Sequence, residues 1–378
     1  MDIKDFKAGM YRAGHEYRYF LPEKINHSFV WTDEGINKLL ERASLKLGEL
    51  NAFSQFVPDI DMFIKMHVTK EAVISSRIEG TRTNMEEALS DKPGIDPERR
   101  DDWQEVNNYI QAMNAAIEEL ENLPLSNRLI KNTHKILLSS GRGEHKTPGE
   151  FRRSQNWIGG ASLADATFIP PAHTELPELL SDLELFLHNR EIQIPHLVKI
   201  AIAHYQFETI HPFLDGNGRI GRLLITLYLV SQGILDVPLL YLSAFFDKNK
   251  TLYYDNLTFV RTKNDLAQWI KFFLVGVIQT AEKGVDTLDK IVKLKKAIEE
   301  EEIPLMGRRA KQGLVLLHQL FRQPVITTQD AEKMTGLSRK AANDLVNLFV
   351  EKKILLEKTG YQRNRVFLFD EYLRLFDD

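Results

Sequence analysis

The residue types that could carry out chemistry are concentrated in twelve consecutive residues, 211–222, with the sequence HPFLDGNGRIGR. Gly216 and Gly218 allow backbone N–H groups to approach a phosphate closely, and a helix that begins there adds the positive end of its dipole. Arg219 and Arg222 lie three residues apart, on one face of the first turn, and planar guanidinium groups suit phosphate oxygens. The segment therefore predicts a site for a nucleoside triphosphate.

The same segment holds a candidate metal ligand and a candidate general base. Asp215 is a hard oxygen ligand, and one carboxylate together with substrate phosphates is a usual way of holding Mg²⁺. The imidazole of His211 has an ordinary pKa of about 6.5, so that near pH 7 it can accept the proton of an incoming hydroxyl group. Asn217 can either donate to a phosphate oxygen or cap the helix. A hydroxyl group could then attack a phosphate held over the glycines.

The composition allows two or three globular domains and excludes several kinds of site. The chain has 378 residues, 43% of them hydrophobic and 27% charged, and a net charge of -4, which is not that of a general nucleic-acid or membrane binder. It has no cysteine, which excludes disulfides, thiolate zinc sites and cysteine nucleophiles. The N-terminus shows no apolar core with a cleavage signal, and no apolar run reaches membrane-spanning length, so we expect a cytoplasmic protein.

Hydrophobic periodicity predicts a mainly α-helical chain. We expect an extended arm over residues 1–30, a β-hairpin within the Gly-, Ser-, Thr- and Pro-rich segment 141–171, and a linker at the four glutamates 299–302. The expected domains are an N-terminal helical region over residues 1–101, a central helical domain over 102–294 that contains the twelve-residue segment, and a C-terminal unit over 307–378.

The C-terminal unit has the pattern of a winged helix. Two helices meet at a turn that contains Gly336, and two short strands follow around Thr359 and Gly360. Residues 307–378 carry thirteen Lys and Arg against nine Asp and Glu, and the second helix begins with the basic sequence Ser338-Arg-Lys. These features favour DNA binding. Winged helices also bind proteins or form dimers, and both alternatives stay open.

The sequence HPFLDGNGRIGR resembles the signature of the Fic (filamentation induced by cAMP) family, HPFx(D/E)GNGRxxR, at every fixed position. The resemblance implies a helical bundle that transfers AMP from ATP to a hydroxyl group of a protein. It also implies roles for the individual residues: His211 as the general base, Asp215 as the magnesium ligand, Gly216, Asn217 and Gly218 as the anion hole, Arg219 as a grip on the phosphates, Arg222 as the γ-phosphate ligand, and Phe213 as a core residue beneath the loop.

The resemblance extends to three further segments. The hairpin over residues 156–171 lies where the family has a flap, which aligns the target protein by strand addition. Tyr253-Tyr254-Asp255 resembles the segment that lines the adenine pocket, which makes Tyr254 a candidate ATP contact. Residues 45–82 resemble the N-terminal region of members that carry an inhibitory helix, which we expect here at about residues 62–80.

The end of that helix matches the family's inhibitory motif, (S/T)xxxE(G/N), with Ser75 and Glu79 at its fixed positions. A glutamate brought to Arg222 would form a charge-assisted fork, and each such hydrogen bond contributes roughly 1.5–3 kcal/mol. It would also place negative charge where the γ-phosphate must go, so that ATP could bind only with its α-phosphate misaligned for attack. We therefore expect Ser75 and Glu79 to restrain the site.

Three classes of function follow. The first is an autoinhibited protein adenylyltransferase that uses ATP and Mg²⁺. The second is removal of AMP at the same site, with Glu79 positioning a water molecule, or transfer of another phosphate-linked group. The third is a DNA-binding regulator whose helical part senses nucleotide, although His211, Asp215 and two arginines together favour catalysis. The expected partners are ATP, a protein with a Ser, Thr or Tyr hydroxyl group, which can be the chain itself, a DNA or protein partner of the winged helix, and a second copy in a homodimer, with no membrane.

Overall fold

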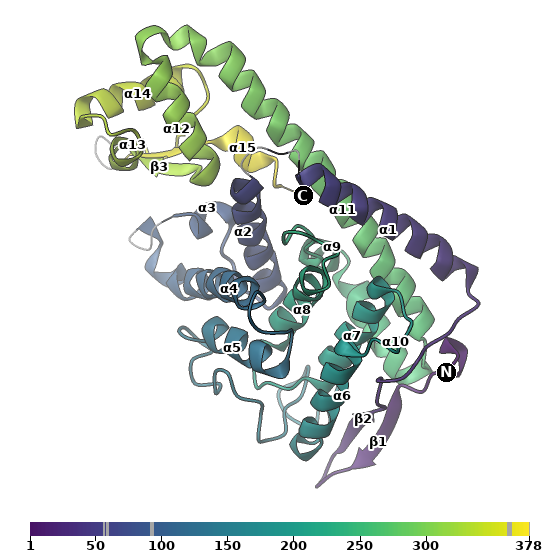
Figure 1. Cartoon of the computed structure of the whole chain (residues 1–378). Helices are drawn as coiled ribbons and strands as arrows, with labels where there is room; N and C mark the ends of the chain where they lie inside the picture. Colours follow the sequence, from purple (N-terminus) through teal and green to yellow (C-terminus); the bar gives the residue numbers. More distant parts are fainter. Residues whose placement is uncertain (56, 58–59, 91–93, 361–364, 378) are drawn as a thin grey trace.

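The computed structural model describes residues 1–55, 57, 60–90, 94–360 and 365–377. It is mainly helical, as expected, and consists of a larger helical body with a smaller C-terminal unit at one end (Figure 1). The longer helices of the body are α1 (Glu34–Ser54), α2 (Ile60–Ile78), α4 (Arg100–Glu119), α5 (Asn127–Leu137), α6 (Leu176–His188), α7 (His196–Ile210), α8 (Asn217–Ser231), α10 (Lys250–Lys263) and α11 (Leu266–Ala297), and the short ones are α3 (Met85–Ala88) and α9 (Ser243–Lys248). None of the described helices is long and apolar enough to cross a membrane.

The centre of the body is α7, which is buried at every residue from Leu197 to Ile210. A helix that is enclosed on all sides belongs to a core, and α8 packs directly beside it. Because α7 ends at Ile210 and α8 begins at Asn217, the junction between them is held by two buried helices. The candidate chemical segment is this junction and the first turns of α8.

Helices α1 and α11 lie side by side along one edge of the body (Figure 1). The periodicity of the first helix is confirmed, with its apolar face buried at Ile36, Ala43, Leu47 and Leu50. Gly284 on α11 permits the two helices to approach closely, since a Cβ atom there would lie 2.9 Å from Leu50 Cδ1. Beyond this pair α11 continues toward the C-terminal unit and connects it to the body (Figure 1).

The prediction of an extended arm over residues 1–30 is wrong. Strands β1 (Gly9–Ala13) and β2 (Arg18–Pro22) form an antiparallel hairpin. The backbone N–H of Phe20 donates to the carbonyl of Ile169 at 2.9 Å, and the Phe20 ring is buried. The apolar residues of this stretch are too irregularly spaced to give a period, and only packing against the body gathers them.

The expected hairpin within residues 141–171 is reduced to a single bridge. Ile158 and Phe168 exchange two backbone hydrogen bonds, at 2.8 and 3.1 Å. The turn between them is closed by the carboxylate of Asp165, which accepts from the backbone N–H groups of Ala161 and Ser162 at 2.8 and 2.7 Å. The two arms of the hairpin therefore meet without forming strands.

The segment expected to be a linker is a packed helical connection. After α11 the chain continues as a π-helix, Ile298–Glu302, and then as a short 3₁₀ helix, Pro304–Arg309. Glu299 binds His318 at 2.7 Å and Glu302 binds Lys352 at 2.8 Å, and both partners belong to the C-terminal unit. The glutamates therefore fasten the unit to α11 instead of separating the two.

The C-terminal unit consists of α12 (Ala310–Arg322), β3 (Val325–Thr327), α13 (Thr328–Thr335), α14 (Arg339–Glu351), β4 (Leu356–Glu357), β5 (Val366–Leu368) and α15 (Asp370–Arg374). Strand β5 lies between β3 and β4 and is antiparallel to both. Gly336 follows α13 in a left-handed conformation, with a φ of 67°, and the Ser338 hydroxyl caps α14. Part of the expected turn between the last two strands, residues 361–364, lies outside the described residues.

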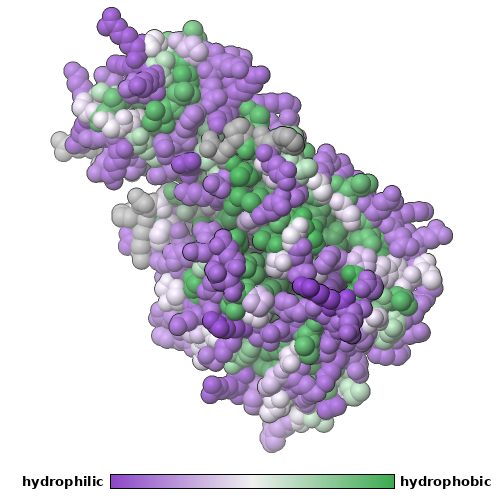
Figure 2. Space-filling view, viewed as in Figure 1, coloured by the Kyte–Doolittle hydropathy of each residue, from purple (hydrophilic) through white to green (hydrophobic). Residues whose placement is uncertain are grey.

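Hydrophilic side chains predominate on the face of the molecule seen in Figure 2. The large apolar side chains that are exposed come from separate parts of the chain, such as Leu45, Leu185 and Leu305. Apolar residues exposed singly are ordinary and need no partner to explain them.

Candidate active site

The junction between α7 and α8 is a tight loop that closes on one of its own side chains. Asn217 Oδ1 accepts from the backbone N–H of Phe213 at 2.8 Å, and Asn217 Nδ2 donates to the Phe213 carbonyl at 2.9 Å. Gly216 leads into α8 with a φ of 76°, a left-handed conformation that favours glycine. The Asn217 side chain is therefore used to shape the loop and does not cap α8.

His134 on α5 supports this loop, and no pattern in the sequence pointed to it. Its ring stacks on Phe213, with the centroids 3.7 Å apart and the planes inclined by 6°. The backbone N–H of Gly149 donates to His134 Nδ1 at 2.9 Å, so that Nε2 carries the hydrogen and donates to the Asp215 carbonyl at 3.0 Å. Burial lowers the pKa of His134 to about 4, which keeps the ring neutral.

The backbone at His211 is strained and is held by two residues that no sequence motif indicated. His211 has φ 50° and ψ 62°, a left-handed conformation that costs a non-glycine residue roughly 1–2 kcal/mol. Arg152 Nε donates to the His211 carbonyl at 2.9 Å, and Asn156 Nδ2 donates to the same oxygen at 3.2 Å. Both residues lie in the irregular segment that leads into the Ile158–Phe168 bridge. Their hydrogen bonds thus fix the direction of the His211 side chain.

The imidazole of His211 is neutral and has one nitrogen available. Its Nδ1 lies 3.3 Å from the Glu208 carbonyl, which only accepts hydrogen bonds, so Nδ1 carries the hydrogen and Nε2 keeps its lone pair. Burial lowers the pKa of His211 to about 4, and the bond to Glu208 opposes that effect only in part. At neutral pH the ring is therefore unprotonated and its Nε2 lone pair is free, as the role of a general base requires, although the lowered pKa makes it a weaker base than a free imidazole.

Asp215 fits the role of the single carboxylate ligand of a magnesium ion. Its side chain is 44% exposed, and Oδ1 accepts from the backbone N–H of Gly216 at 2.6 Å. The described part of the chain contains no group of three or more His, Asp and Glu side chains that could hold a metal by themselves. A Mg²⁺ ion at Asp215 would therefore take its other ligands from substrate phosphates and water.

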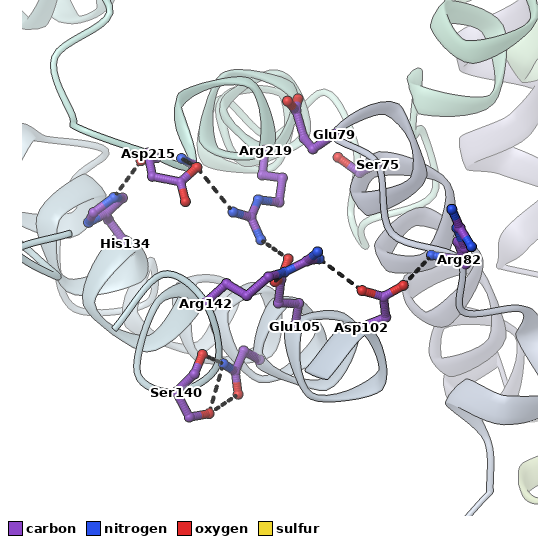
Figure 3. Close-up of polar contacts among 12 residues, drawn as sticks. Ser75, Glu79, Arg82, Asp102, Glu105, His134, Ser140, Arg142, Asp215 and Arg219 are labelled. Carbon is purple, nitrogen blue, oxygen red and sulfur yellow. Dashed lines mark hydrogen bonds and ion pairs between the residues drawn. The ribbon is translucent and has the colours of Figure 1, made fainter. Parts of the chain in front are cut away.

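Arg219 is turned toward α4 and does not line the cavity beside the loop (Figure 3). Its side chain is 4% exposed, with Nη1 3.5 Å from Glu105 Oε2 and Nη2 3.6 Å from Asp215 Oδ1. In this position it orients Asp215 and would reach a phosphate only through a rearrangement. The structure thus gives Arg219 a different set of contacts from the direct grip that the family resemblance implies.

The contacts of Arg219 belong to a network of ion pairs and hydrogen bonds that reaches the segment after α2 (Figure 3). Glu105 Oε1 accepts from Arg142 Nε at 2.6 Å, and Arg142 Nη2 donates to Asp102 at 2.8 Å. Asp102 also accepts from the backbone N–H of Arg82 at 2.7 Å, three residues after Glu79. One charged network therefore spans α8, α4 and the segment that follows α2.

Arg222 is held by the last turn of α2. Its Nε donates to Ser75 Oγ at 2.8 Å, and its Nη2 donates to the Ser75 carbonyl at 2.9 Å and to Glu79 Oε1 at 2.8 Å. The Arg222 side chain is 1% exposed, whereas that of Glu79 is 37% exposed. Ser75 and Glu79 therefore occupy the Nε and Nη2 donors of Arg222, which a phosphate bound on that side of the guanidinium group would need.

Glu79 also covers the beginning of α8. A Cβ atom placed at Gly218 would lie 2.3 Å from Glu79 Oε1, so the carboxylate sits directly over this glycine. Burial alone would raise the pKa of Glu79, but the charge of Arg222 and its hydrogen bond outweigh that effect, and the pKa lies below its usual value. An ionised carboxylate thus fills the space over the helix end where an anion is best held.

A second carboxylate, that of Glu208, lies beside the same arginine. Burial raises its pKa to about 7, while the charge of Arg222 acts in the opposite direction. Its Oε1 is buried and has no hydrogen-bond partner among the described residues, and a Cβ atom at Gly221 would lie 2.1 Å from it. Glu208 therefore changes protonation state near neutral pH in contact with α8.

One cavity brings together most of the residues that the sequence pointed to. Its lining includes Glu79, His211, Asp215, Gly216, Asn217, Gly218, Arg222 and Tyr254. Arg219 and Ser75 are not part of the lining, but they contact the lining residues Asp215 and Arg222. Tyr254 is 41% exposed, and with Leu257 and Arg261 it forms a wall next to the loop. Its neighbour Tyr253 is buried, with its hydroxyl 2.9 Å from His204 Nε2. Both tyrosines line the cavity, and Tyr254 is the more exposed of the two.

Comparison with known proteins agrees with this geometry. Residues 37–118 match the model of the Fic/DOC family N-terminal region, and residues 124–229 match the model of the Fic/DOC family. Two adjoining segments of the chain therefore match the Fic/DOC family, which confirms the resemblance carried by residues 211–222. The matched N-terminal region contains α2 and Glu79.

The chain is similar to proteins named Protein adenylyltransferase Fic. The one from Aedes aegypti is 29% identical over 280 residues, which are 69% of this chain and 52% of the relative. The one from Culex quinquefasciatus is 32% identical over 217 residues, 54% of this chain and 40% of the relative. The aligned part of the chain thus spans about half of these relatives or less.

Solved structures show the same fold. A Fic family protein from Desulfovibrio desulfuricans G20 superposes with a TM-score of 0.56 at 20% identity, over 92% of this chain and 98% of that one. A Fic domain containing signaling protein from Bacteroides thetaiotaomicron VPI-5482 gives a TM-score of 0.52 at 18% identity, over 68% of this chain and 97% of that one. At such identities the likeness concerns the fold alone.

Proposed function

We propose that the chain is a protein adenylyltransferase, which moves AMP from ATP to the hydroxyl group of a protein side chain. The observation that carries the proposal is the neutral His211 ring, with Nε2 available, in one cavity with Asp215 and the uncapped first turn of α8. The relatives from Aedes aegypti and Culex quinquefasciatus bear the name of this activity.

In the proposed reaction, the hydroxyl oxygen of the target displaces pyrophosphate from the α-phosphorus of ATP. His211 Nε2 takes the hydroxyl proton while the new O–P bond forms, and the bond from the α-phosphorus to the bridging oxygen breaks. The backbone N–H groups at the start of α8 stabilise the negative charge that develops, and Tyr254 contacts the nucleotide base. Asp215 would hold a magnesium ion, which would neutralise charge on the phosphates.

The proposed enzyme is held inactive by Glu79. Its hydrogen bond to Arg222 is charge-assisted, and such bonds contribute roughly 1.5–3 kcal/mol. The terminal phosphate of ATP needs the same guanidinium group, and it would be repelled by the Glu79 carboxylate over Gly218. Release of Glu79 from Arg222 therefore permits ATP to bind in a productive position.

The test is label transfer from ATP labelled at the α-phosphate, followed by mass spectrometry of the full-length chain. Glu79→Gly is expected to raise labelling about tenfold or more, because one charge-assisted hydrogen bond no longer opposes the phosphate. Glu98→Gly removes an exposed glutamate from the same region and should leave labelling unchanged. Equal labelling of the wild type and the Glu79→Gly variant would exclude Glu79 from the regulation.

The role of the base is tested in the same assay. His211→Ala, introduced into the Glu79→Gly chain, is expected to lower labelling by about 10²–10⁴-fold, the usual contribution of a positioned base. ATP binding, measured by calorimetry, should persist. Undiminished labelling would rule out His211 as the base, and an added mass other than that of AMP would identify a different transferred group.

A second candidate is removal of AMP from a modified protein at the same site. It is favoured by the partly exposed Glu79 carboxylate over Gly218, where it could orient a water molecule. Protein labelled by the Glu79→Gly variant should then lose AMP when wild-type chain is added, and a Glu79→Gln chain should release none. Retention of the label in both cases would reject this candidate.

A third candidate is DNA binding by the C-terminal unit. Ser338, Arg339 and Lys340 are all exposed at the start of α14, the helix expected to contact DNA. A gel shift with a specific duplex that weakens steeply with salt would support it. An absence of any shift with selected duplexes would favour a protein partner for this unit.

A further inference from the structure

Helix α2 separates the active site from a second cavity. Ser75 and Glu79 face Arg222, whereas His67, Lys70 and Ile74, spaced by three and four residues, line the other cavity. The cavity is completed by α9 and α11, and α9 packs against both α2 and α11. A ligand there would touch the inhibitory helix one to three turns before Glu79.

The charged side chains of this cavity are predominantly basic. Lys70 on α2, Lys248 on α9 and Lys283 on α11 all line it. Among the described lining residues Glu71 is the one carboxylate, and it accepts from the hydroxyl groups of Tyr109 and Ser243. Burial raises the pKa of Glu71, so its negative charge is disfavoured. The cavity therefore favours an anion.

Two buried polar groups in the lining have no hydrogen-bond partner in the described part of the chain. They are the hydroxyl group of Tyr241, a residue that is 7% exposed, and Nε2 of His67. Burial lowers the pKa of His67 to about 3, so the ring is neutral. Buried groups without partners are uncommon in folded proteins, because each costs roughly 1–3 kcal/mol, and a ligand at the site would explain them.

The rest of the lining is partly apolar. The side chains of Ile74, Leu239 and Phe245 form apolar parts of the cavity wall. Thr280 and Thr287 line the cavity from α11. A pocket with apolar walls and a few convergent polar groups is the usual form of a small-molecule site. The walls suit a small ring or a short hydrocarbon body.

We propose that this cavity binds a small organic anion, with an apolar body and one carboxylate or phosphate group, and that the bound anion holds α2 in its inhibitory position. The cavity is formed while Glu79 is paired with Arg222, and a ligand that requires this form of the cavity would bind the inhibited state in preference. A ligand shifts an equilibrium toward the state that it binds more tightly. The proposed effect of the anion on inhibition rests on the proposed transferase activity, whereas the proposed binding of the anion does not.

Binding is tested by isothermal titration calorimetry on the full-length chain without ATP. Phenyl phosphate and benzoate combine a ring with an anion and are expected to bind at least tenfold more tightly than phenol or inorganic phosphate. A carboxylate ligand is indicated if benzoate binds more tightly, and a phosphate ligand if phenyl phosphate does. If none of the four probes binds, or phenol binds as tightly as the anions, the proposal is wrong.

Variants locate the binding. Lys248→Glu combined with Lys283→Glu should weaken phenyl phosphate at least tenfold. Lys290→Glu combined with Lys293→Glu makes the same charge change on α11, outside the cavity lining, and should have no effect. Tyr241→Phe removes only the partnerless hydroxyl group and should weaken binding severalfold without loss of thermal stability. Equal effects of the two lysine pairs, or unchanged affinity in Tyr241→Phe, would overturn the assignment.

Regulation is tested with the transfer assay. Phenyl phosphate at a saturating concentration is expected to lower transfer by the wild type, to have no effect on Glu79→Gly, and to have none on the Lys248→Glu, Lys283→Glu chain. Activation, or equal inhibition of all three chains, would refute the coupling to α2. A Glu79→Gly chain that transfers nothing would refute the proposed function and leave the calorimetric result standing.

Discussion

Arg219 and Arg222 lie three residues apart on α8, and both side chains are almost completely buried, yet their surroundings differ. Arg219 faces Glu105, which lies in the second turn of α4 and also binds Arg142. Arg222 faces Glu79, which lies just beyond the end of α2. The side chain of Glu105 is 10% exposed and that of Glu79 is 37% exposed.

The difference in exposure suggests that the Arg219–Glu105 contact is permanent, whereas the Arg222–Glu79 contact can be exchanged for another. A buried ion pair within a packed network is costly to break, because water cannot replace the lost partner. A half-exposed carboxylate at a helix end can leave, since water can solvate it and a phosphate can take its place. We infer that Arg219 serves to position Asp215, while Arg222 alternates between Glu79 and substrate.

The largest expected effect tests this contrast directly. Glu105→Ala leaves the buried guanidinium group of Arg219 with the Asp215 carboxylate, 3.6 Å away, as its remaining charged neighbour, and should lower the free energy of unfolding by about 3 kcal/mol or more. Glu79→Ala should lower it less, by roughly 1.5–3 kcal/mol for the lost charge-assisted hydrogen bond, since its carboxylate is partly solvated and Ser75 still binds Arg222. Urea denaturation of both variants measures the two values. Equal losses would remove the distinction between the two arginines.

A smaller effect concerns the protonation of Glu208 beside Arg222. Its pKa is raised to about 7 in the folded chain from an ordinary value of 4.5, so between these pH values the folded state binds the additional proton. This contribution to stability is present below pH 4.5 and is lost as the pH rises through about 7, with a slope of up to about 1.4 kcal/mol per pH unit.

Glu208→Gln isolates this slope. Buried histidines such as His134 and His211, with pKa values lowered to about 4, produce a slope of the opposite sign, and they are present in both chains. Urea denaturation from pH 4.5 to 7.5 should therefore show stability rising more steeply with pH in Glu208→Gln than in the wild type. Parallel curves would show that Glu208 is not protonated in the folded state.

The smallest expected effect is at the outer end of the Arg219 network. Arg142 is 56% exposed, so Arg142→Ala should lower the free energy of unfolding by less than about 1 kcal/mol. In a Glu105→Ala background the same change should cost still less, because a shared partner is already gone. Arg128→Ala, which removes an arginine from α5, is the control. A loss as large as that of Glu105→Ala would mean that the network depends on its exposed end.

The sequence predicted the elements whose signals are local. The helical period identified α1, and the spacing within residues 211–222 was enough to place His211, Asp215 and two arginines at one helix junction. The motif that ends at Glu79 likewise pointed to α2, and the structure places Glu79 against Arg222. In α1 and in residues 211–222 the residues that carry the signal are close together in the chain. Glu79 is far from Arg222 in the chain, but a carboxylate in this motif requires a cationic partner.

Long-range packing decided the rest. Arg152 and His134 hold the loop through backbone carbonyl groups, and hydrogen bonds to backbone leave no residue pattern to detect. The N-terminal hairpin is ordered by contacts with residues near Phe168, far along the chain. The direction of Arg219 depends on where α4 places Glu105, which no spacing on α8 reveals. The sequence by itself determined the groups expected to carry the chemistry, His211, Asp215 and the two arginines. Only the tertiary structure decided which arginine is fixed and which can be released, because burial and solvation of their carboxylate partners arise from packing.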